Sequence, residues 1–303
     1  MKNKILLIGS CQTAGYGFFL NSMCPDTEFE AFQLETLAPE HRPERIADLM
    51  ARKHEYDAVL SPPLSELFLD MAKDKIRESF SGVPVYIYTN VYFSGTTPDL
   101  TYIGGFAGRC TGPMGDYHSK IVLTGFMKGL DQATTRSLFN SSFMAKLDLF
   151  NEYKRSQDRL VMLDAQSDIQ ITDMIFSAVK SEMLFFANNH PTTKIFFEYA
   201  KRISQRLAAD KLVTTVYDLP WNPLAYPNTL AYSSVFPVYP EVALEHGLSY
   251  SSGYYFKSPD RPHLYSLNSF IEHEYAALEA FGRDKLEQMP QWIDINKTLS
   301  TAQ

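Results

Sequence analysis

The first third of the chain alternates short apolar segments with segments of helical period. The predicted strands are Ile5–Ile8, Ala58–Leu60 and Val83–Phe93, and the predicted helices are Thr13–Leu20, Pro43–Lys53 and Glu66–Phe80. Continuous apolar runs are typical of strands that are buried on both faces. Alternation of such strands with helices is typical of a parallel sheet. The sequence therefore predicts an α/β fold, in which helices flank a doubly wound parallel sheet.

The pattern changes after residue 93. A long stretch rich in Gly, Thr and Pro, 94–119, has no clear period and is predicted to be an ordered functional loop. Further helices are predicted over 119–130, 132–155 and 167–182, the last with Ser167 and Gln170 at capping-box spacing. A strand over Met183–Ala187 leads into a long helix with Pro191 in its first turn.

The rest of the chain, 218–303, is loop-rich, with a last helix predicted near Leu267–Phe281. The tail alternates Pro-rich loops with short apolar pieces, so it is predicted to be partly helical and partly irregular. We expect a single α/β domain over residues 1–303, because a chain of this length can bury one large core.

Charge and cysteine content narrow the class of protein. The net charge is −7 and the basic residues are scattered, which argues against a nucleic-acid partner. No apolar run approaches the roughly 18 residues of a membrane span. Three cysteines without a CxxC pair argue against a disulfide framework and a structural zinc site, so a cytoplasmic location is expected.

The N-terminal apolar run is too short for a secretory signal. Ile5–Ile8 supplies four apolar residues before Gly9, whereas a signal peptide needs roughly 7–15. The same run suits a buried strand followed by a tight turn and a helix. A lipid-modified Cys11 behind a signal peptide is therefore disfavoured, and an intact N-terminus is expected.

Two reactive side chains directly follow predicted strands. Cys11 comes after the first strand and His190 after a later one. Ligands of open α/β sheets bind beyond the carboxyl ends of the strands, and a helix N-terminus favours a thiolate. Cys11 and His190 are therefore candidates for a nucleophile and its base. The alternatives are a buried structural thiol and a histidine that only caps a helix.

A third candidate lies at the end of the long loop, in the segment GDYHSK. Asp116 or Ser119 is expected to cap the following helix, which would leave His118 in the first turn of that helix. His118 is then either an exposed histidine, a polar contact to substrate or cofactor, or a second acid or base. No sequence motif for a metal, and no P-loop or GxGxxG motif, is present.

Several segments together resemble the WcbI-like family of capsular polysaccharide biosynthesis enzymes, over about residues 4–250. They are IGSCQ, YDAVLSPPLS, YFSGTTPDLTYI, PMGDYHSKIVLTGFMKGL, FFANNHPT and FPVYPEVALEHGL. The resemblance implies a coenzyme A-binding O-acetyltransferase that acts on a polysaccharide or its glycan precursor. Ser10 stands where the family usually has Asn, which could alter a hydrogen-bond donor in the site.

Carried over by motif, the resemblance implies Cys11, Gln12, His118 and His190 as site residues, and neighbouring residues complete the set of candidates. The catalytic candidates are Cys11, His118 and His190. The candidates for binding the cofactor are Ser10, Gln12, Asp116, Tyr117, Ser119 and Asn189. Arg109, Lys120 and Lys194 are further candidates for contacts to the phosphates of coenzyme A. The donor would be acetyl-CoA and the acceptor a glycan or a nucleotide sugar.

A more distant likeness is to the SGNH hydrolases, in which a Gly-x-Ser turn after the first strand carries the nucleophile. Two transfer mechanisms remain open. In a ping-pong route Cys11 takes the acyl group, and His190, whose position after an apolar strand is the better fixed, deprotonates the sugar hydroxyl. In a direct route a histidine activates the hydroxyl while Cys11 and Gln12 line an oxyanion site. A thiol esterase or deacetylase and a non-catalytic glycan-binding protein are the rival functions.

Overall fold

A computed structural model describes residues 2–105, 108–222, 225–259 and 263–301. The chain divides into two compact units, and the positions of the two relative to each other are not determined. The first unit consists of residues 1–91, 159–177 and 191–230, and the second of residues 92–158, 178–190 and 231–303. The expectation of a single domain stays a prediction.

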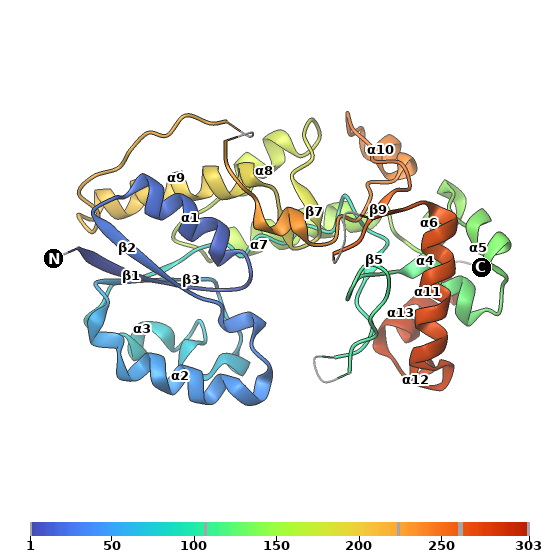
Figure 1. The fold of residues 1–303 in the computed structure, drawn as a ribbon, viewed down its shortest axis with the longest axis horizontal. Coiled ribbons are helices and arrows are strands. Elements are labelled where there is room, and N and C mark those ends of the chain that lie inside the picture. The colour runs from blue at the N-terminus through green and yellow to red at the C-terminus, as the bar shows by residue number, and fades with distance from the viewer. Residues whose placement is uncertain (1, 106–107, 223–224, 260–262, 302–303) are drawn as a thin grey trace. The chain divides into compact units, whose positions relative to one another are not determined.

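The first unit is built on a four-stranded parallel sheet with the order β2-β1-β3-β4. The strands are β1 (Asn3–Ile8), β2 (Thr27–Phe32), β3 (Ala58–Ser61) and β4 (Val85–Ile87). Helices α1 (Thr13–Met23) and α9 (Thr193–Ala209) cover one face of the sheet, and α2 (Arg42–Ala51) and α3 (Ile76–Ser79) cover the other (Figure 1). The α/β fold with a parallel sheet and flanking helices is therefore confirmed.

Burial on both faces explains the continuous apolar run of β1. Ile5, Leu6, Leu7 and Ile8 are all buried, and Leu6 and Ile8 pack into one cluster with Ile46 of α2. No strand is predicted over 27–32, yet β2 lies there at the edge of the sheet. Only Thr27 and Phe29 of this strand are buried, so it lacks the apolar run that marks β1.

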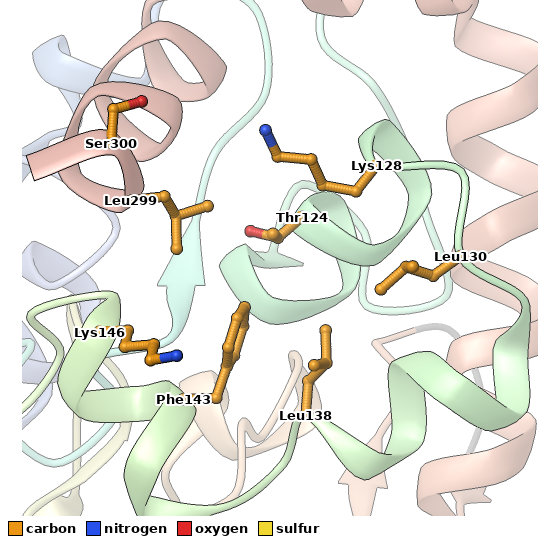
Figure 2. Close-up of a pocket in the computed structure, with 8 residues that line it drawn as sticks. All are labelled: Thr124, Lys128, Leu130, Leu138, Phe143, Lys146, Leu299 and Ser300. Atoms are coloured by element: carbon orange, nitrogen blue, oxygen red, sulfur yellow. The ribbon is translucent and has the colours of Figure 1, made fainter. Parts of the chain in front are cut away.

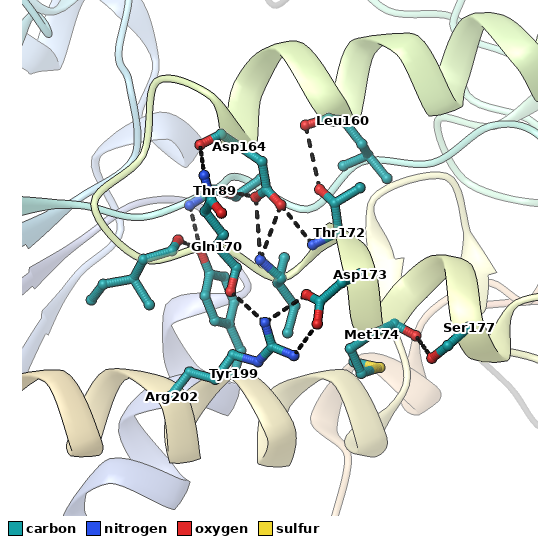
Figure 3. Close-up of polar contacts among 12 residues, drawn as sticks. Thr89, Leu160, Asp164, Gln170, Thr172, Asp173, Met174, Ser177, Tyr199 and Arg202 are labelled. Atoms are coloured by element: carbon teal, nitrogen blue, oxygen red, sulfur yellow. Dashed lines mark hydrogen bonds and ion pairs between the residues drawn. The ribbon is translucent and has the colours of Figure 1, made fainter.

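Strand β4 is shorter than the predicted strand over Val83–Phe93. After Ile87 the backbone pairs with the segment before α8 (Thr172–Ala178), through Tyr88 and Ile169. The capping box at Ser167 and Gln170 is wrong. The carboxylate of Asp164 instead accepts hydrogen bonds from the backbone N–H groups of residues 171 and 172, so the helix begins at Thr172 (Figure 3).

Two other predicted helices differ from the observed ones, one by an interruption and one by a later start. The region 66–80 holds a 3₁₀ segment, Glu66–Met71, which is kinked at Leu69 with a positive φ of 52°, and then the short helix α3. Pro191 does not lie in the first turn of α9. It belongs to the two-residue strand β8 (His190–Pro191), and the helix begins at Thr193.

The second unit is mainly helical. Its helices are α4 (Lys120–Met127), α5 (Gln132–Ser137), α6 (Ser141–Lys146), α10 (Pro240–His246), α11 (Leu267–Phe281), α12 (Arg283–Glu287) and α13 (Pro290–Thr301). Helix α7 (Asn151–Asp164) continues from this unit into the first. The helical segment predicted over 132–155 is divided, because Asn140 caps a new helix, α6, and α7 begins at Asn151.

Short antiparallel strand pairs connect the helices of the second unit. They are β5 (Leu100–Thr101) with β6 (His118–Ser119), and β9 (Phe256–Lys257) with β10 (Leu264–Tyr265). The predicted strand before His190 is β7 (Phe185–Ala187), which pairs with β8. Within the described residues β7 is not part of the parallel sheet, so the expectation that His190 follows a strand of that sheet is wrong.

Candidate active site

Cys11 lies in the turn between β1 and α1. In the strand order β2-β1-β3-β4, strand β2 pairs with one edge of β1, and β3, the next strand along the chain, pairs with the other edge. The strand order therefore reverses between β1 and β3, which is a topological switch point. Ligands of open α/β sheets bind in the crevice at such a point, beyond the carboxyl ends of the strands. Cys11 therefore has the position expected of a reactive group.

The turn is held by close packing against the sheet. The Tyr88 hydroxyl donates to the carbonyl oxygen of Ile8 at 2.6 Å. A Cβ atom at Gly9 would lie 2.5 Å from that hydroxyl oxygen and 2.9 Å from a methyl group of Thr13. Only glycine leaves the space that Tyr88 occupies, which explains the small residue before Ser10 and Cys11.

Gln12 fixes the turn from the inside. Its side chain is buried, and its Nε2 donates to the carbonyl oxygen of Val91 at 2.8 Å. Its Oε1 accepts a hydrogen bond from the Tyr16 hydroxyl at 3.0 Å. The Ser10 hydroxyl accepts from the backbone N–H of Gln12 at 3.4 Å. These contacts give both residues a structural role, and their predicted role in binding a cofactor stays a prediction.

The Cys11 thiol is half-buried, and burial raises its pKa. Hydrogen bonds from Ser10 and from the backbone N–H groups of Cys11 and Gln12 lower the pKa, but desolvation outweighs them. The resting form of Cys11 is therefore the thiol. This differs from the thiolate expected at a helix N-terminus, because the sequence does not reveal how far the sulfur is removed from water.

Sequence reasoning missed an acidic residue beside this turn. Glu35 lies in a 3₁₀ turn, Leu34–Thr36, just after β2, and its backbone N–H donates to the carbonyl oxygen of Gly9 at 3.1 Å. Desolvation raises the pKa of Glu35 to about 7, although the charge of Arg42 lowers it. The sequence could have indicated Glu35 as an acidic residue shortly after a strand that neighbours β1. That inference required β2, which was not predicted.

His190 belongs to the second unit, where it is buried beside Tyr117. The Tyr117 hydroxyl donates to Oδ1 of Asn189 at 2.8 Å and lies 3.1 Å from Nε2 of His190. Because that hydroxyl has a single hydrogen, Nε2 must carry the proton that points to Tyr117. The lone pair of the neutral ring is then on Nδ1, which is buried and has no hydrogen-bond partner among the described residues. Desolvation lowers the pKa of His190 to about 4, so the ring is neutral at pH 7.

A cavity of about 340 Å³ adjoins His190, Asn189 and Tyr117. Arg109 and Asp116 form an ion pair on its wall, and the Arg109 guanidinium lies 5.1 Å from the centre of the Tyr102 ring. The remaining lining residues come from three segments and are Met114, Gly115, Ser233, Ser234 and Pro259. The second unit thus places four of the predicted residues and an aromatic ring around one polar cavity: Asp116, Tyr117, Asn189 and His190.

His118 does not lie in the first turn of α4 but in β6, and it is fully buried. Its Nδ1 is 2.7 Å from Oε1 of Glu274 on α11, and its Nε2 is 3.0 Å from the carbonyl oxygen of Cys110. Both partners are acceptors, so both ring nitrogens carry hydrogen. Desolvation opposes this charge, but the charge and hydrogen bond of Glu274, together with the hydrogen bond to Cys110, outweigh desolvation and raise the pKa of His118 well above its usual value. This environment favours a structural role for His118.

Ser119 caps α4, as one alternative predicted, by accepting the backbone N–H of Val122 at 3.1 Å. The Lys120 ammonium donates to the carbonyl oxygen of Pro98 at 2.6 Å, and desolvation lowers its pKa. Lys120 is thus tied to the long loop, and Arg109 to Asp116. Lys194 is the second residue of α9, which belongs to the first unit. Contacts of these three residues to phosphates stay predictions.

A larger cavity of the second unit, about 460 Å³, lies away from these groups (Figure 2). Its described lining combines the lysines Lys128 and Lys146 with apolar side chains and two hydroxyl groups. Lys128 donates to Asn296 at 2.9 Å and lies over the Trp292 ring. None of the predicted site residues lines this cavity, so volume alone does not identify the candidate site.

Within the described part of the chain, no cluster of three or more His, Cys, Asp or Glu side chains could hold a metal ion. In the same residues, no helix combines the length and the apolar character that crossing a bilayer requires. Cys11, Cys24 and Cys110 are free thiols, and Cys24 and Cys110 are buried.

Comparison with known proteins agrees with this fold. The family model described as polysaccharide biosynthesis enzyme WcbI matches residues 4–212. A solved structure of WcbI, described as a novel polysaccharide biosynthesis enzyme, has a similar fold. That structure is described as the native protein without a disulfide bond between coenzyme A and a cysteine. The TM-score is 0.65 at 19% sequence identity, over 100% of this chain and 95% of that one. A search among curated proteins finds no match. The chain belongs to the WcbI family of polysaccharide biosynthesis enzymes.

Proposed function

We propose that this protein is a coenzyme A-dependent O-acyltransferase, which moves an acetyl group from acetyl-CoA to a sugar hydroxyl in capsular polysaccharide biosynthesis. The observation that carries the proposal is His190, a neutral imidazole that lines a polar cavity and whose buried Nδ1 has no hydrogen-bond partner among the described residues. A general base needs such a free lone pair near its substrate. The family supports a glycan acceptor, and the description of the related structure supports coenzyme A.

The cavity beside His190 has the character of a sugar site. Hydroxyl, amide and ion-paired groups line it together with the Tyr102 ring, and sugars are bound by such polar groups and aromatic faces. We assign the acceptor, a glycan or a nucleotide sugar, to this cavity. Asn189 and Tyr117 hold the imidazole so that Nε2 keeps its proton and Nδ1 receives the proton of the sugar hydroxyl.

Cys11 is the acyl carrier in this proposal. Its sulfur attacks the thioester carbon of acetyl-CoA, the bond from that carbon to the sulfur of coenzyme A breaks, and an acetyl-enzyme forms. The sugar hydroxyl then gives its proton to His190 as its oxygen attacks the acetyl carbon, and the Cys11 sulfur leaves as a thiolate. The His190 imidazolium afterwards releases its proton to water, and the thiolate takes up a proton from water, which restores the resting enzyme. Exchange of one thioester for another is nearly isoenergetic, so the thiol is a suitable carrier. In the direct route no acetyl-enzyme would form.

The decisive experiment follows release of free coenzyme A from acetyl-CoA, with and without a panel of nucleotide sugars and oligosaccharides. Release that requires the sugar supports transfer. Release without any sugar identifies a thiol esterase or deacetylase, and sugar binding without release identifies a non-catalytic glycan-binding protein. Intact-mass measurement in the absence of sugar distinguishes the routes, because only the ping-pong route gives an acetyl-enzyme, which Cys11→Ala cannot form.

The free thiols of Cys11, Cys24 and Cys110 support a reducing compartment, and we place the protein in the cytoplasm on that ground. Acetyl-CoA as donor agrees with this location. Mass spectrometry of protein from its native host tests it: a chain cleaved before Cys11, or a lipid on Cys11, would contradict the assignment.

A further inference from the structure

Glu35 is held against the turn that carries Cys11. Two backbone hydrogen bonds continue the pairing of β1 with β2 beyond the strands: Gly9 N–H donates to Phe32 O, and Glu35 N–H donates to Gly9 O, both at 3.1 Å. The backbone of Glu35 is therefore hydrogen-bonded to Gly9, and Cys11 lies two residues after Gly9 in the same turn.

The Glu35 carboxylate has one oxygen without a partner. Oε1 accepts a long hydrogen bond of 3.4 Å from the Asn90 side chain. Oε2 is buried and has no hydrogen-bond partner among the described residues. A buried unsatisfied carboxylate oxygen is costly, and such groups in folded proteins are often functional.

Glu35 has electrostatic interactions with three groups from different parts of the first unit: Arg42, Cys11 and Tyr88. Arg42 at the start of α2 favours its ionised form. On the other side, the charge of Glu35 raises the pKa of both the Cys11 thiol and the Tyr88 hydroxyl. Tyr88 is already committed to the Ile8 carbonyl. Cys11 is therefore the titratable neighbour left to exchange a proton with Glu35, although no hydrogen bond joins the two side chains among the described residues.

We propose that Glu35 is the acid–base partner of Cys11: its carboxylate takes the thiol proton as the sulfur attacks acetyl-CoA, and returns it to the departing coenzyme A. The S–H bond of Cys11 breaks and an O–H bond forms on Glu35. The thiolate of coenzyme A leaves and then takes this proton, which restores the carboxylate. This step rests on the proposed function and assigns its first half, as His190 serves the second.

Charge conservation is the physical reason for this pairing. If the thiol lost its proton to water while Glu35 was ionised, two negative charges would share a desolvated site, which is costly. Transfer from sulfur to carboxylate keeps a single negative charge throughout. With desolvation raising the pKa of Glu35 to about 7, the carboxylate is basic enough to accept a proton and acidic enough to return it near neutral pH.

The test compares two reactions of Cys11 in wild type, Glu35→Gln and the control Glu40→Gln. Glu40 is exposed and lies in the same connecting segment. The first reaction is alkylation by iodoacetamide, which needs only the thiolate, with the modified residue located by mass spectrometry. The second is single-turnover formation of the acetyl-enzyme from acetyl-CoA, together with release of coenzyme A.

The proposal predicts opposite changes in Glu35→Gln. Alkylation of Cys11 becomes faster below the pKa of the thiol, because the charge that opposes the thiolate is gone. Acetylation becomes roughly 10²–10⁴-fold slower, the usual loss when a general acid–base group is removed. Wild-type acetylation rises with pH through about 7, and this limb is absent from the variant. Glu40→Gln should match wild type in both reactions.

Three results would overturn the proposal in different ways. If Glu35→Gln acetylates as fast as wild type, or if both reactions accelerate together, Glu35 acts only through its charge and is not the proton acceptor. If both reactions slow by a similar factor, its role is structural. If wild type itself forms no acetyl-enzyme, the ping-pong function fails, whatever the variant does.

Discussion

Replacing Glu274 with Gln should strongly destabilise the second unit. Glu274 and His118 are both 0% exposed, and the carboxylate is the only counter-charge that faces the His118 ring among its described contacts. A glutamine would keep the shape but remove the charge. Its amide N–H groups would face the N–H of His118 or the position of Oε2, where the described residues offer no acceptor.

The magnitude follows from the loss of one partner of a buried ion pair, which costs about 3–5 kcal/mol. Each 1 kcal/mol shifts the Tm of a domain of 150–250 residues by roughly 2–4 °C. We therefore expect Tm to fall by about 6–20 °C. Gly112 leaves little room for adjustment, because a Cβ there would lie 2.7 Å from Oε2 of Glu274 and 3.1 Å from Cε1 of His118.

The pH dependence has a definite sign. The pKa of His118 is raised above its unfolded value, so the folded state binds more protons than the unfolded state. The stabilisation is complete below about pH 6.5 and declines as the pH rises through the folded pKa of His118. The difference in Tm between wild type and Glu274→Gln should therefore be largest in mildly acidic buffer and shrink in alkaline buffer.

Thermal unfolding followed by circular dichroism at several pH values measures both effects. Glu279→Gln is the matched control, because Glu279 is exposed on the same helix, α11, and should change Tm very little. A fall in Tm no larger than that of the control would refute the energetic argument. A large fall that does not vary with pH would refute the charged state assigned to His118.

Three further predictions concern the candidate site. His190→Ala should lower kcat by roughly 10²–10⁴-fold in the sugar-dependent release of coenzyme A. In wild type, protonation of His190 should lower kcat/KM only as the pH falls toward about 4, because desolvation lowers the pKa of His190 to that value. Gly9→Ala should destabilise the first unit by about 1–3 kcal/mol in urea unfolding, because its Cβ would overlap the Tyr88 hydroxyl, and Tyr88→Phe in the same chain should recover part of the loss. Calorimetry should show coenzyme A binding that weakens as salt is added, since contacts between basic groups and phosphates are screened, and no binding at millimolar coenzyme A would contradict the proposed function.

The parallel sheet could be predicted where burial is complete and local. β1 and β3 are short runs of apolar residues that are buried on both faces, and such runs are visible in the sequence. The helix Leu267–Phe281 was predicted with the observed ends, but it is not the last helix, because α12 and α13 follow it. Strand β2 could not be found in this way, because an edge strand buries only alternate residues and its Glu28 and Glu30 conceal the pattern.

Helix starts were mispredicted where the capping group lies outside the local motif. Asp164 caps α8 from a position 8 residues before Thr172, whereas a capping box has its partners three residues apart. Asp164 can reach the helix because the intervening segment folds back beside Tyr88. A spacing rule cannot anticipate a cap that tertiary structure supplies.

The two histidines show where sequence reasoning about the site stops. His118 and His190 each precede a helix by a few residues, and His190 was favoured as the base because it follows an apolar strand. That strand, β7, pairs only with β8 within the described structure, so membership of the parallel sheet does not distinguish the two residues. What distinguishes them is distant in sequence: Glu274, 156 positions away, occupies one ring nitrogen of His118, while Nδ1 of His190 has no such partner among the described residues. The same local pattern thus yields a charged ring locked in the core and a neutral ring with a free lone pair, and only the second has the protonation state that a general base requires.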